Sequence, residues 1–360
     1  MVIQSLKLID FRNYENIDVE FNSGINFIYG KNGQGKTNLI ESLYLITHLK
    51  SFRTSKASDL TSYSKKNSTV QTNLFKQDVR HDIRITLHEN LKKVLHNQKI
   101  VNFTSEYIKN FLSLLFSPDQ LVAYKEFPLE RRNFIDRILF LIDSKYFQRI
   151  KEFNRIKKQK NVLLRNANKK DIFVWNQLMA AVIPEIIGSR EVIVEKINEV
   201  LPEIFKALTG RDADLKFFYG NDLENKTDVS SDSILKFLTE KIDQEIGNGY
   251  CQFGPHKDNF WMTLDGKRDR QAFSQGEYRI AYLSLQLAMN KIISEMLGFR
   301  PILLLDDIFS ELDETVCENT IDYITSSDNQ VFMTSTAVPD KFRDIGNAIC
   351  ISNGNLSTTQ

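Results

Sequence analysis

The sequence INFIYGKNGQGKTNLIESLYLITHLK, residues 25–50, decides the fold of this chain. Its first five residues are an apolar run that predicts a buried strand, and the apolar residues after Lys36 recur at the spacing of a helix. Between the two, residues 30–37 match the pattern G-x-x-x-x-G-K-[ST] at every position. Because a strand precedes the pattern and a helix follows it, the stretch predicts a P-loop rather than a chance glycine turn.

The residue types in this loop suit a bound nucleotide. Its glycines let successive N–H groups point into one concavity at the N-terminus of a helix, which favours phosphate. Lys36 is expected to reach the β- and γ-phosphates, and the Thr37 hydroxyl is expected to bind Mg²⁺. ATP and Mg²⁺ are therefore the predicted cofactors. The predicted ATP contacts within this stretch are Gly30, Lys31, Asn32, Gly33, Gln34, Gly35, Lys36, Thr37 and Asn38.

Length and composition set wider limits. The chain has 360 residues, 42% hydrophobic and 26% charged, which predicts a soluble protein of about two domains. Its net charge of +1 names no partner, so any nucleic-acid surface must be local. Three cysteines far apart predict a reduced compartment without a disulfide framework or zinc site. No signal-peptide pattern and no apolar run near the ~18 residues of a membrane span occur, so we expect a cytoplasmic protein with no membrane partner.

Residues 1–126 are predicted to form a strand-rich lobe. Alternating apolar residues predict strands over 2–28, interrupted by a turn that carries Arg12 and Asn13. This turn either touches the ATP or is a solvated hairpin tip. Residues 84–87 and 94–101 predict a hairpin around positions 89 and 90, and residues 105–116 predict a short helix. The polar loop after the P-loop helix offers three candidate DNA contacts, Lys50, Arg53 and Lys56.

The composition becomes helical after about residue 127. Two antiparallel helices are expected between 129 and 201, with a turn at 166–171, and Pro184 is expected to kink or restart the second helix. Residues 149–170 carry nine Lys or Arg and one acid, a net charge of +8 (9 − 1), which fits either a solvated face or contact with DNA phosphates. We therefore expect a head formed by 1–126 and 250–360 and a helical arm over 127–249. The candidate DNA contacts on the arm are Arg149, Lys151, Arg155, Lys157, Lys158 and Lys160.

Residues 301–307, PILLLDD, are an apolar run that ends in two carboxylates. Such a strand would bring Asp306 to the Mg²⁺ held by Thr37. Asp307 would lie one residue further along, where it could polarise the attacking water. The candidate catalytic residues are therefore Asp307, Asp306 and Lys36.

A second anion site is predicted near the end of the chain. The loop Ser274, Gln275, Gly276 and Glu277 precedes a long helix, and Ser274 with Glu277 fits a capping box. Because the loop opens a helix N-terminus, it is either an ordinary cap or a segment that reaches the γ-phosphate held by another copy of the chain.

The order of these motifs resembles ABC-type ATPases of the SMC class, and most closely the RecF family of recombination and repair proteins, over essentially the whole chain. The segments that carry the resemblance are FRNY at 11–14, GKNGQGKTN at 30–38, FSPDQ at 116–120 with Arg131 and Arg132, GPHKD at 254–258, and LLLDDIFSELD at 303–313.

The resemblance implies an α/β fold, an ABC-type P-loop ATPase head with a mixed-sheet lobe and a mainly helical arm. It implies homodimerisation on ATP, weak DNA-dependent ATPase activity, and binding to double-stranded and gapped DNA. It also implies help in loading the RecA recombinase, with RecR and RecO as partners. In this family pattern, residues 274–277 act in trans and Asp313 lies at the dimer seam.

The chain departs from the wider ABC pattern at two places. Asp307 stands where most ABC enzymes have Glu, so its shorter side chain predicts slow hydrolysis. Thr334 and Thr336 stand where many carry a switch His, and the Gln-loop residue is either Asp119 or Gln120. Two other classes share the P-loop, a transporter's nucleotide-binding subunit and a P-loop kinase of a small metabolite. The long basic insert argues against the first, and the loop at 274–277 argues against the second.

Overall fold

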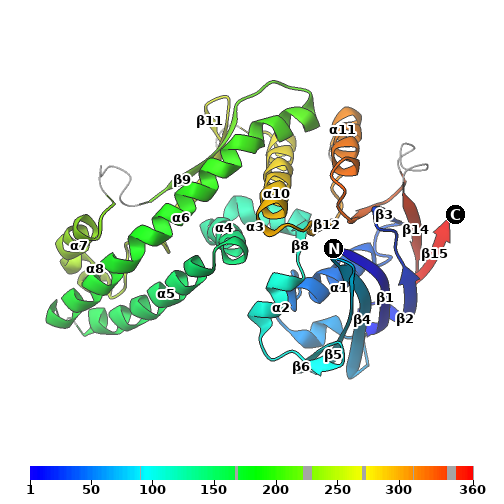
Figure 1. The fold of residues 1–360 in the computed structure, drawn as a ribbon, viewed down its shortest axis with the longest axis horizontal. Helices are drawn as coiled ribbons and strands as arrows, with labels where there is room; N and C mark the ends of the chain where they lie inside the picture. The colour runs from blue at the N-terminus through cyan, green and yellow to red at the C-terminus, as the bar shows by residue number, and fades with distance from the viewer. Residues whose placement is uncertain are drawn as a thin grey trace. The chain divides into compact units, whose positions relative to one another are not determined.

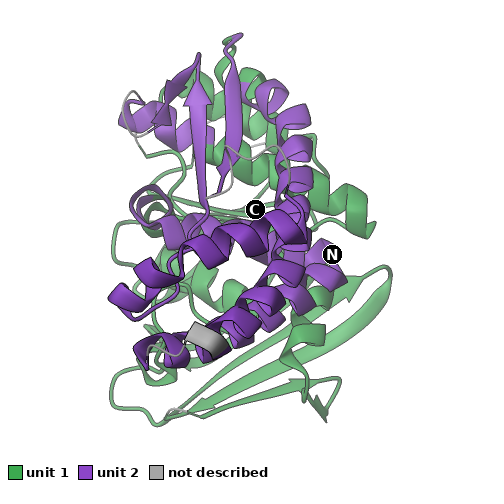
Figure 2. Cartoon of the chain, turned by 90° about the vertical axis from the view of Figure 1, so that its left-hand side faces the viewer, with its two compact units in different colours: residues 1–121, 206–211, 282–360 green, residues 122–205, 212–281 purple. Residues whose placement is uncertain are grey.

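The computed structural model describes residues 1–89, 91–166, 169–221, 229–269, 273–310, 312–338 and 346–359. These residues form two units (Figure 2). The first unit contains residues 1–121, 206–211 and 282–360, and the second contains residues 122–205 and 212–281. The predicted division placed its boundaries after 126 and 249, whereas the structure groups 250–281 with the helical unit.

The first unit holds two six-stranded sheets. One sheet is antiparallel, with the order β2-β1-β4-β5-β6-β7. Its strands are β1 (Val2–Phe11), β2 (Tyr14–Glu20), β4 (Asn67–Lys76), β5 (Val79–His88), β6 (Leu91–His96) and β7 (Lys99–Ile100). The other sheet is mixed, with the order β15-β14-β3-β13-β12-β8, and only β15 runs antiparallel to its neighbour. Its strands are β3 (Ile25–Tyr29), β8 (Ser113–Phe116), β12 (Ile302–Leu305), β13 (Val331–Ser335), β14 (Asn347–Ser352) and β15 (Asn355–Thr359).

Helix α1 (Lys36–His48) packs against both sheets (Figure 1). Leu39, Ile40 and Leu43 are completely buried and share one apolar cluster with Leu8 of β1 and Leu304 of β12. Burying such side chains stabilises the fold by about 1.5–3 kcal/mol each. The packing therefore fixes the start of α1 relative to the ends of β3 and β12. The other described helices of the first unit include η1 (Ala57–Leu60), α2 (Thr104–Asn110) and α11 (Glu314–Thr325). Helices α3 (Pro118–Glu126) and α10 (Gln275–Leu297) each belong partly to both units.

The predicted helix over 105–116 is wrong in its second half. Helix α2 ends at Asn110, and β8 then pairs in parallel with β12, Leu115 opposite Leu304. Short apolar runs suit a buried strand and a buried helix equally, so periodicity alone does not separate the two. The pairing with β12, nearly 200 residues later, decides the outcome. Of the turn predicted at 89 and 90, position 90 lies outside the described residues.

The second unit is mainly helical and holds a three-stranded antiparallel sheet, β11-β10-β9. Its main elements are α4 (Pro128–Ile142), α5 (Ser144–Arg165), α6 (Lys169–Thr209), β9 (Leu215–Gly220), α7 (Ser231–Glu240), α8 (Ile242–Asn248), β10 (Asn259–Leu264) and β11 (Lys267–Arg268). Helix α6 does not restart at Pro184, since it continues through Pro184 and Pro202 to Thr209. Of the turn predicted at 166–171, residues 167 and 168 lie outside the described part.

Helix α6 is long and apolar enough over Asp171–Thr209 to cross a membrane by length and composition. The expectation that no stretch passes this test is therefore wrong. The helix nevertheless contributes Ile172, Met179, Ile186 and Ile197 to the protein interior, each completely buried. It also buries a charged side chain, Arg190, so its burial is that of a core helix.

Arg190 holds the second unit together from inside. Its guanidinium donates to the Asp258 carboxylate at 2.5 Å, to the Asp136 carboxylate at 2.8 Å, to the Tyr146 hydroxyl at 3.0 Å and to the Pro255 carbonyl at 2.8 Å. The arginine is 1% exposed. These partners come from α4, α5 and the loop before β10, so the GPHKD segment has a structural role in closing this network.

We expect Asp258→Ala to destabilise the protein by about 3–5 kcal/mol, because it leaves a buried arginine with incomplete compensation. The matched control is Asp214→Ala in the same unit. Asp214 bonds the half-exposed Lys216, and exposed pairs contribute about 0–1 kcal/mol. Urea unfolding followed by circular dichroism measures both. Equal losses for the two variants would contradict the role given to Arg190.

Candidate nucleotide site

The P-loop connects β3 to α1 through left-handed glycines. Gly30, Gly33 and Gly35 have φ of 151°, 79° and 117°, a region that other residues rarely adopt. At Gly35, a Cβ would lie 2.6–2.9 Å from the side chains of Asn13 and Tyr14. The loop therefore needs glycine here for its backbone conformation and for space.

Lys36 folds back over its own loop. Its ammonium donates to the Gly30 carbonyl at 2.7 Å and to the Lys31 carbonyl at 3.1 Å. Partial burial lowers its pKa, although the nearby carboxylates of Asp307 and Asp306 oppose this change. A phosphate placed in the loop can replace the two carbonyls as the partner of this cation.

Asp306 lies between two threonines. Its Oδ1 accepts hydrogen bonds from the Thr37 hydroxyl at 3.2 Å and from the Thr334 hydroxyl at 2.7 Å, and the residue is 4% exposed. Burial raises the pKa of this carboxyl, while the two hydroxyl bonds lower it. The structure thus brings together Thr37 and Asp306, the residues that the sequence predicts as metal ligands.

These two side chains fit Mg²⁺. The ion prefers oxygen ligands, and it commonly takes one or two from the protein and the rest from phosphates and water. A hydroxyl and a buried carboxylate within hydrogen-bonding distance of each other provide such a pair. Groups of three or more His, Cys, Asp or Glu side chains able to hold a metal are absent from the described residues.

Asp307 is held in an uncommon backbone conformation. Its φ is +50°, its N–H donates to the Thr334 hydroxyl at 2.9 Å, and its carboxylate accepts from the Ser310 hydroxyl at 3.0 Å. Non-glycine residues in this region often mark functional sites. Thr334 therefore forms hydrogen bonds with both Asp306 and Asp307. The sequence places Thr334 where many ABC proteins carry a switch His, but it does not predict these bonds. The carboxylate can orient a water molecule beside Asp306.

The turn at residues 12 and 13 contacts the P-loop and is not a solvated hairpin tip. Asn13 donates to the Gln34 carbonyl at 2.9 Å and accepts from Asn38 at 2.8 Å. Tyr14 donates to the Gly35 carbonyl at 2.9 Å. The structure thus assigns Asn13 and Tyr14 to holding the loop in shape.

Arg12 faces Glu41, a residue that the sequence prediction missed. Glu41 is completely buried in α1, where it accepts from Arg12 at 2.8 Å and lies 3.6 Å from Arg53. Arg53 also donates to the Asn38 side chain at 2.9 Å. The sequence did contain a signal, because the acid Glu41 stands among the apolar residues of the P-loop helix and therefore needs a cationic partner. Arg53, predicted as a DNA contact, is therefore also bound to the P-loop helix.

A groove of about 910 Å³ lies beside this point. Cationic side chains of the polar loop line it together with Lys92 of β6, and apolar side chains form part of its wall. The lining includes Lys50, Phe52, Arg53, Lys56, Leu87 and Lys92. The structure thus places the three predicted loop cations along one groove of the first unit.

The loop at 274–277 forms the predicted capping box. The Ser274 N–H donates to the Glu277 carboxylate at 3.0 Å, and the Glu277 N–H donates to the Ser274 hydroxyl at 3.2 Å. A Cβ on Gly276 would meet no atom within 4 Å, so the loop is open at the start of α10. Gln275 is the first residue of this helix, within the second unit.

Asp313, predicted at a dimer seam, caps a helix. Its carboxylate accepts from the Val316 N–H at 2.8 Å at the start of α11. Position 311 of the same motif lies outside the described residues. The Gln-loop candidates Asp119 and Gln120 lie in the first turns of α3, where the Gln120 N–H donates to the Ser117 hydroxyl at 3.3 Å.

The Lys and Arg side chains of the basic run on α5 differ in how deeply they are buried. Lys151, Arg155 and Lys158 are exposed and recur at helical spacing, so they form one basic stripe. Lys160 is completely buried and its ammonium lies 2.6 Å from the Glu245 carboxylate, which is also buried. The prediction of Lys160 as a DNA contact is therefore wrong, because a buried and paired cation does not reach a phosphate outside.

The other two predicted contacts on α5 are partly engaged. Arg149 lies 2.7 Å from the Glu185 carboxylate and 3.4 Å from that of Glu152. Lys157 is half-buried with its ammonium 5.9 Å from the Phe153 ring, and burial lowers its pKa. Neither is as free to contact DNA as the three residues of the basic stripe.

Comparison with known proteins gives consistent matches. The model of the RecF/RecN/SMC N-terminal domain matches residues 2–351. The DNA replication and repair protein RecF of Clostridium kluyveri is 34% identical over 347 residues, with 94% of each chain covered. A solved structure of the recombination mediator protein RecF with ATP superposes with a TM-score of 0.85 at 27% identity, covering 100% of this chain and 98% of that one.

An Smc head bound to the C-winged helix domain of ScpA gives a TM-score of 0.62 at 18% identity, covering 100% of this chain and 97% of that one. This likeness concerns the fold alone. The predicted fold class, a mixed α/β ABC-type ATPase head with a mainly helical second part, is confirmed.

We expect Asp306→Asn to raise the free energy of unfolding of the nucleotide-free protein at neutral pH by about 1 kcal/mol, because it removes a desolvated charge while an amide oxygen still accepts both hydroxyl bonds. Burial raises the pKa of Asp306 in the folded state, so the penalty is full above the folded pKa, shrinks as pH falls through it, and is absent below the unfolded pKa. The stability difference should therefore shrink on acidification. Thermal unfolding from pH 8 to 4 measures it, with exposed Asp18→Asn as control. A destabilised variant at neutral pH would contradict this account.

Proposed function

Because this chain belongs to the RecF family of DNA replication and repair proteins, within the RecF/RecN/SMC N-terminal domain family, we propose that it is a DNA-binding ATPase of recombinational repair. The observation that carries the proposal is the meeting of Lys36, Thr37, Asp306 and Asp307 at one end of the mixed sheet. These residues supply the cation, the hydroxyl and the carboxylates that ATP hydrolysis needs.

ATP is the proposed ligand of the P-loop. The phosphates lie against the N–H groups at the start of α1, and Lys36 exchanges the Gly30 carbonyl for a phosphate oxygen. Thr37 and Asp306 hold Mg²⁺, which neutralises phosphate charge when bound. Asp307 accepts a hydrogen bond from the attacking water. Because the side chain of Asp307 is one methylene shorter than that of Glu, hydrolysis is slow. The weak ATPase activity depends on DNA.

Two copies of the chain enclose the ATP. The loop at 274–277 supports this proposal, since it is a capped and open N-terminus of a 23-residue helix and so a second place for phosphate. In the dimer, Ser274 and Gly276 of one copy contact the γ-phosphate held by the other. Asp313, at the cap of α11, lies at the seam between the copies. Hydrolysis removes this shared phosphate and leads to release.

The DNA is double-stranded, at or near single-strand gaps. Lys151, Arg155 and Lys158 of the basic stripe and the cations of the groove beside Arg53 provide phosphate contacts without base contacts. Such contacts suit a protein that binds many sequences. RecR and RecO are the proposed partners, the loading of RecA is the proposed outcome, and the cytoplasm is the proposed location. No described contact favours a transporter subunit.

Light scattering should show a monomer without nucleotide or with ADP, and a dimer with saturating ATP and Mg²⁺. Asp307→Asn should keep the dimer for longer than wild type, because it binds ATP but orders water poorly. Lys36→Arg should remain monomeric, since a larger cation does not fit the site beside Gly30. A wild-type protein that stays monomeric with ATP rules out the shared site.

Replacing Lys151, Arg155 and Lys158 by Gln should weaken duplex binding and flatten its dependence on salt, because each lost phosphate contact reduces the slope of log K against log [salt] by about 0.9. The matched control replaces Lys236, Lys267 and Lys291, three other exposed lysines, by Gln. Fluorescence anisotropy with a labelled duplex between 50 and 300 mM salt measures both. The same slope for the two triple variants would exclude the basic stripe from the DNA interface.

A further inference from the structure

A second group of cations in the helical unit has no role in the sites described above. Arg132 of α4, Lys157 of α5 and Lys257 of the loop before β10 surround His256, and we call these four residues the cation cluster. The pKa of His256 is lowered to about 4, mainly by burial and in smaller part by Lys157, Lys257 and Arg132, while the hydrogen bond to the Cys251 carbonyl opposes this change. The electrostatic effect of all three cations thus reaches one imidazole.

Contacts on the same residues support this gathering. The Arg132 guanidinium donates to the Asp258 carbonyl at 2.8 Å, two residues after His256. The Phe153 ring lies 5.7 Å from the His256 ring and 5.9 Å from the Lys157 ammonium. Helices α4 and α5 and the GPHKD segment therefore converge on one place.

The cluster has more positive than negative charge around it. Arg132, Lys157 and Lys257 make no ion pair with any of the residues that the structure describes. The two carboxylates that act on Arg132, those of Asp258 and Asp136, are both bound by Arg190. Bringing like charges together is unfavourable, and partial burial of Arg132 and Lys157 adds to the cost, so an anion placed here would relieve the repulsion.

His256 adds an unsatisfied nitrogen. Its Nε2 lies 3.0 Å from the Cys251 carbonyl, which requires Nε2 to carry the proton. Its Nδ1 is buried, and none of the described residues provides a hydrogen bond to it. Because this nitrogen is enclosed, an anion held by the neighbouring cations would stabilise the protonated ring through its charge rather than through a hydrogen bond to Nδ1. Anion binding and protonation of His256 should therefore favour each other.

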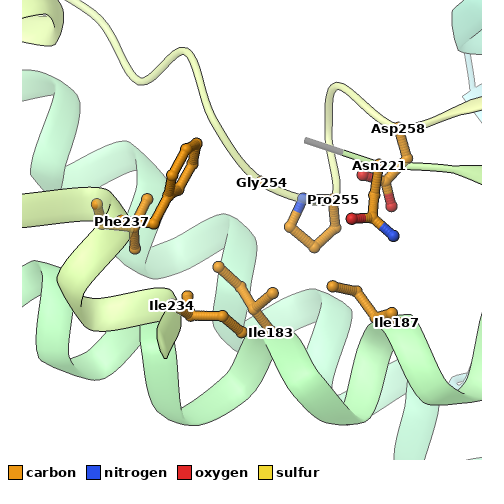
Figure 3. A pocket seen from close by; sticks show the side chains of 9 residues that line it. Ile183, Ile187, Asn221, Ile234, Phe237, Gly254, Pro255 and Asp258 are labelled. Carbon is orange, nitrogen blue, oxygen red and sulfur yellow. The ribbon is translucent and has the colours of Figure 1, made fainter. Parts of the chain in front are cut away.

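A cavity beside the same loop is too small for a ligand. Gly254 and Pro255 pack toward Ile183 and Ile187 of α6 and Phe237 of α7, as Figure 3 shows. The cavity between them is about 10 Å³, the size of about one water molecule, and its lining is mostly apolar.

We propose that Arg132, Lys157, His256 and Lys257 form a binding site for a phosphate group of the DNA backbone. Three cations from separate elements provide the charge, and the imidazole adds positive charge when it is protonated. The site differs from the basic stripe, whose three residues all lie on α5. The inference rests on the proposed DNA-binding function, and it adds a phosphate contact made by α4, α5 and the GPHKD segment together.

The first test measures duplex binding by fluorescence anisotropy against salt for Lys157→Gln/Lys257→Gln, which leaves the Arg132 bond to Asp258 in place. One lost phosphate contact should reduce the slope of log K against log [salt] by about 0.9 and weaken binding about five- to tenfold near 0.1 M salt. Lys236→Gln/Lys267→Gln removes the same charge from exposed positions of the same unit and should change the slope little.

An unchanged slope for Lys157→Gln/Lys257→Gln, or an equal reduction in the control, overturns the site while leaving a DNA-binding ATPase intact. If the wild-type protein itself does not bind duplex, the proposed function fails together with the site. The two failures are therefore distinguishable in one experiment.

The second test follows the imidazole signals of the five histidines by nuclear magnetic resonance, with His256 assigned through His256→Gln. Duplex DNA should raise the pKa of His256 by at least one unit, and inorganic pyrophosphate, the free-phosphate probe, should raise it less. A shift with pyrophosphate but not with duplex means that the DNA backbone is not the source of the phosphate. No shift with either probe means that an anion does not reach the ring.

Discussion

The candidate chemistry of the first unit depends on one desolvated carboxylate. Asp306 ends β12, accepts a hydrogen bond from Thr37 at the start of α1, and accepts another from Thr334 of β13. A buried carboxylate is unfavourable unless hydrogen bonds or cations compensate it, and two hydroxyls do so only in part. The same contacts that align three elements therefore leave negative charge available to a bound cation. The alignment of these elements and the proposed affinity for a metal nucleotide thus have the same physical cause.

In the helical unit, by contrast, buried charges such as Arg190 and Lys160 have oppositely charged partners. Arg190 is enclosed by two carboxylates, a hydroxyl and a carbonyl, and Lys160 is paired with Glu245. Such pairs fix the packing of neighbouring helices because their geometry tolerates little change, although they add less stability than apolar contacts of the same size. The head keeps an incompletely compensated acid where ligands enter, whereas this unit pairs its charges in the interior and carries excess cations nearer the surface.

Local patterns predicted the residues whose role is set by neighbours in sequence. The P-loop and the capping box at Ser274 follow from short-range rules, and the structure has both. Roles set by distant partners were missed, including β8, which needs β12, and Glu41, which needs Arg12. The burial of Lys160 could be predicted from the sequence, whereas its partner Glu245 could not. The spacing of Lys160 from Phe153 placed it on the apolar face of α5.

This spacing shows why the net charge of a segment is a poor guide to its surface. Phe153, Ile156, Lys160 and Leu164 recur at intervals of three and four residues and are all buried. A helix that buries this face turns Lys151 and other intervening cations outward, so periodicity decides which charges meet solvent before any partner is considered. Of the +8 on residues 149–170, Lys160 is neutralised internally and Arg149 is bound by glutamates. The charge that remains for the proposed DNA contacts is smaller than the sequence total, and it is confined to defined faces of the unit.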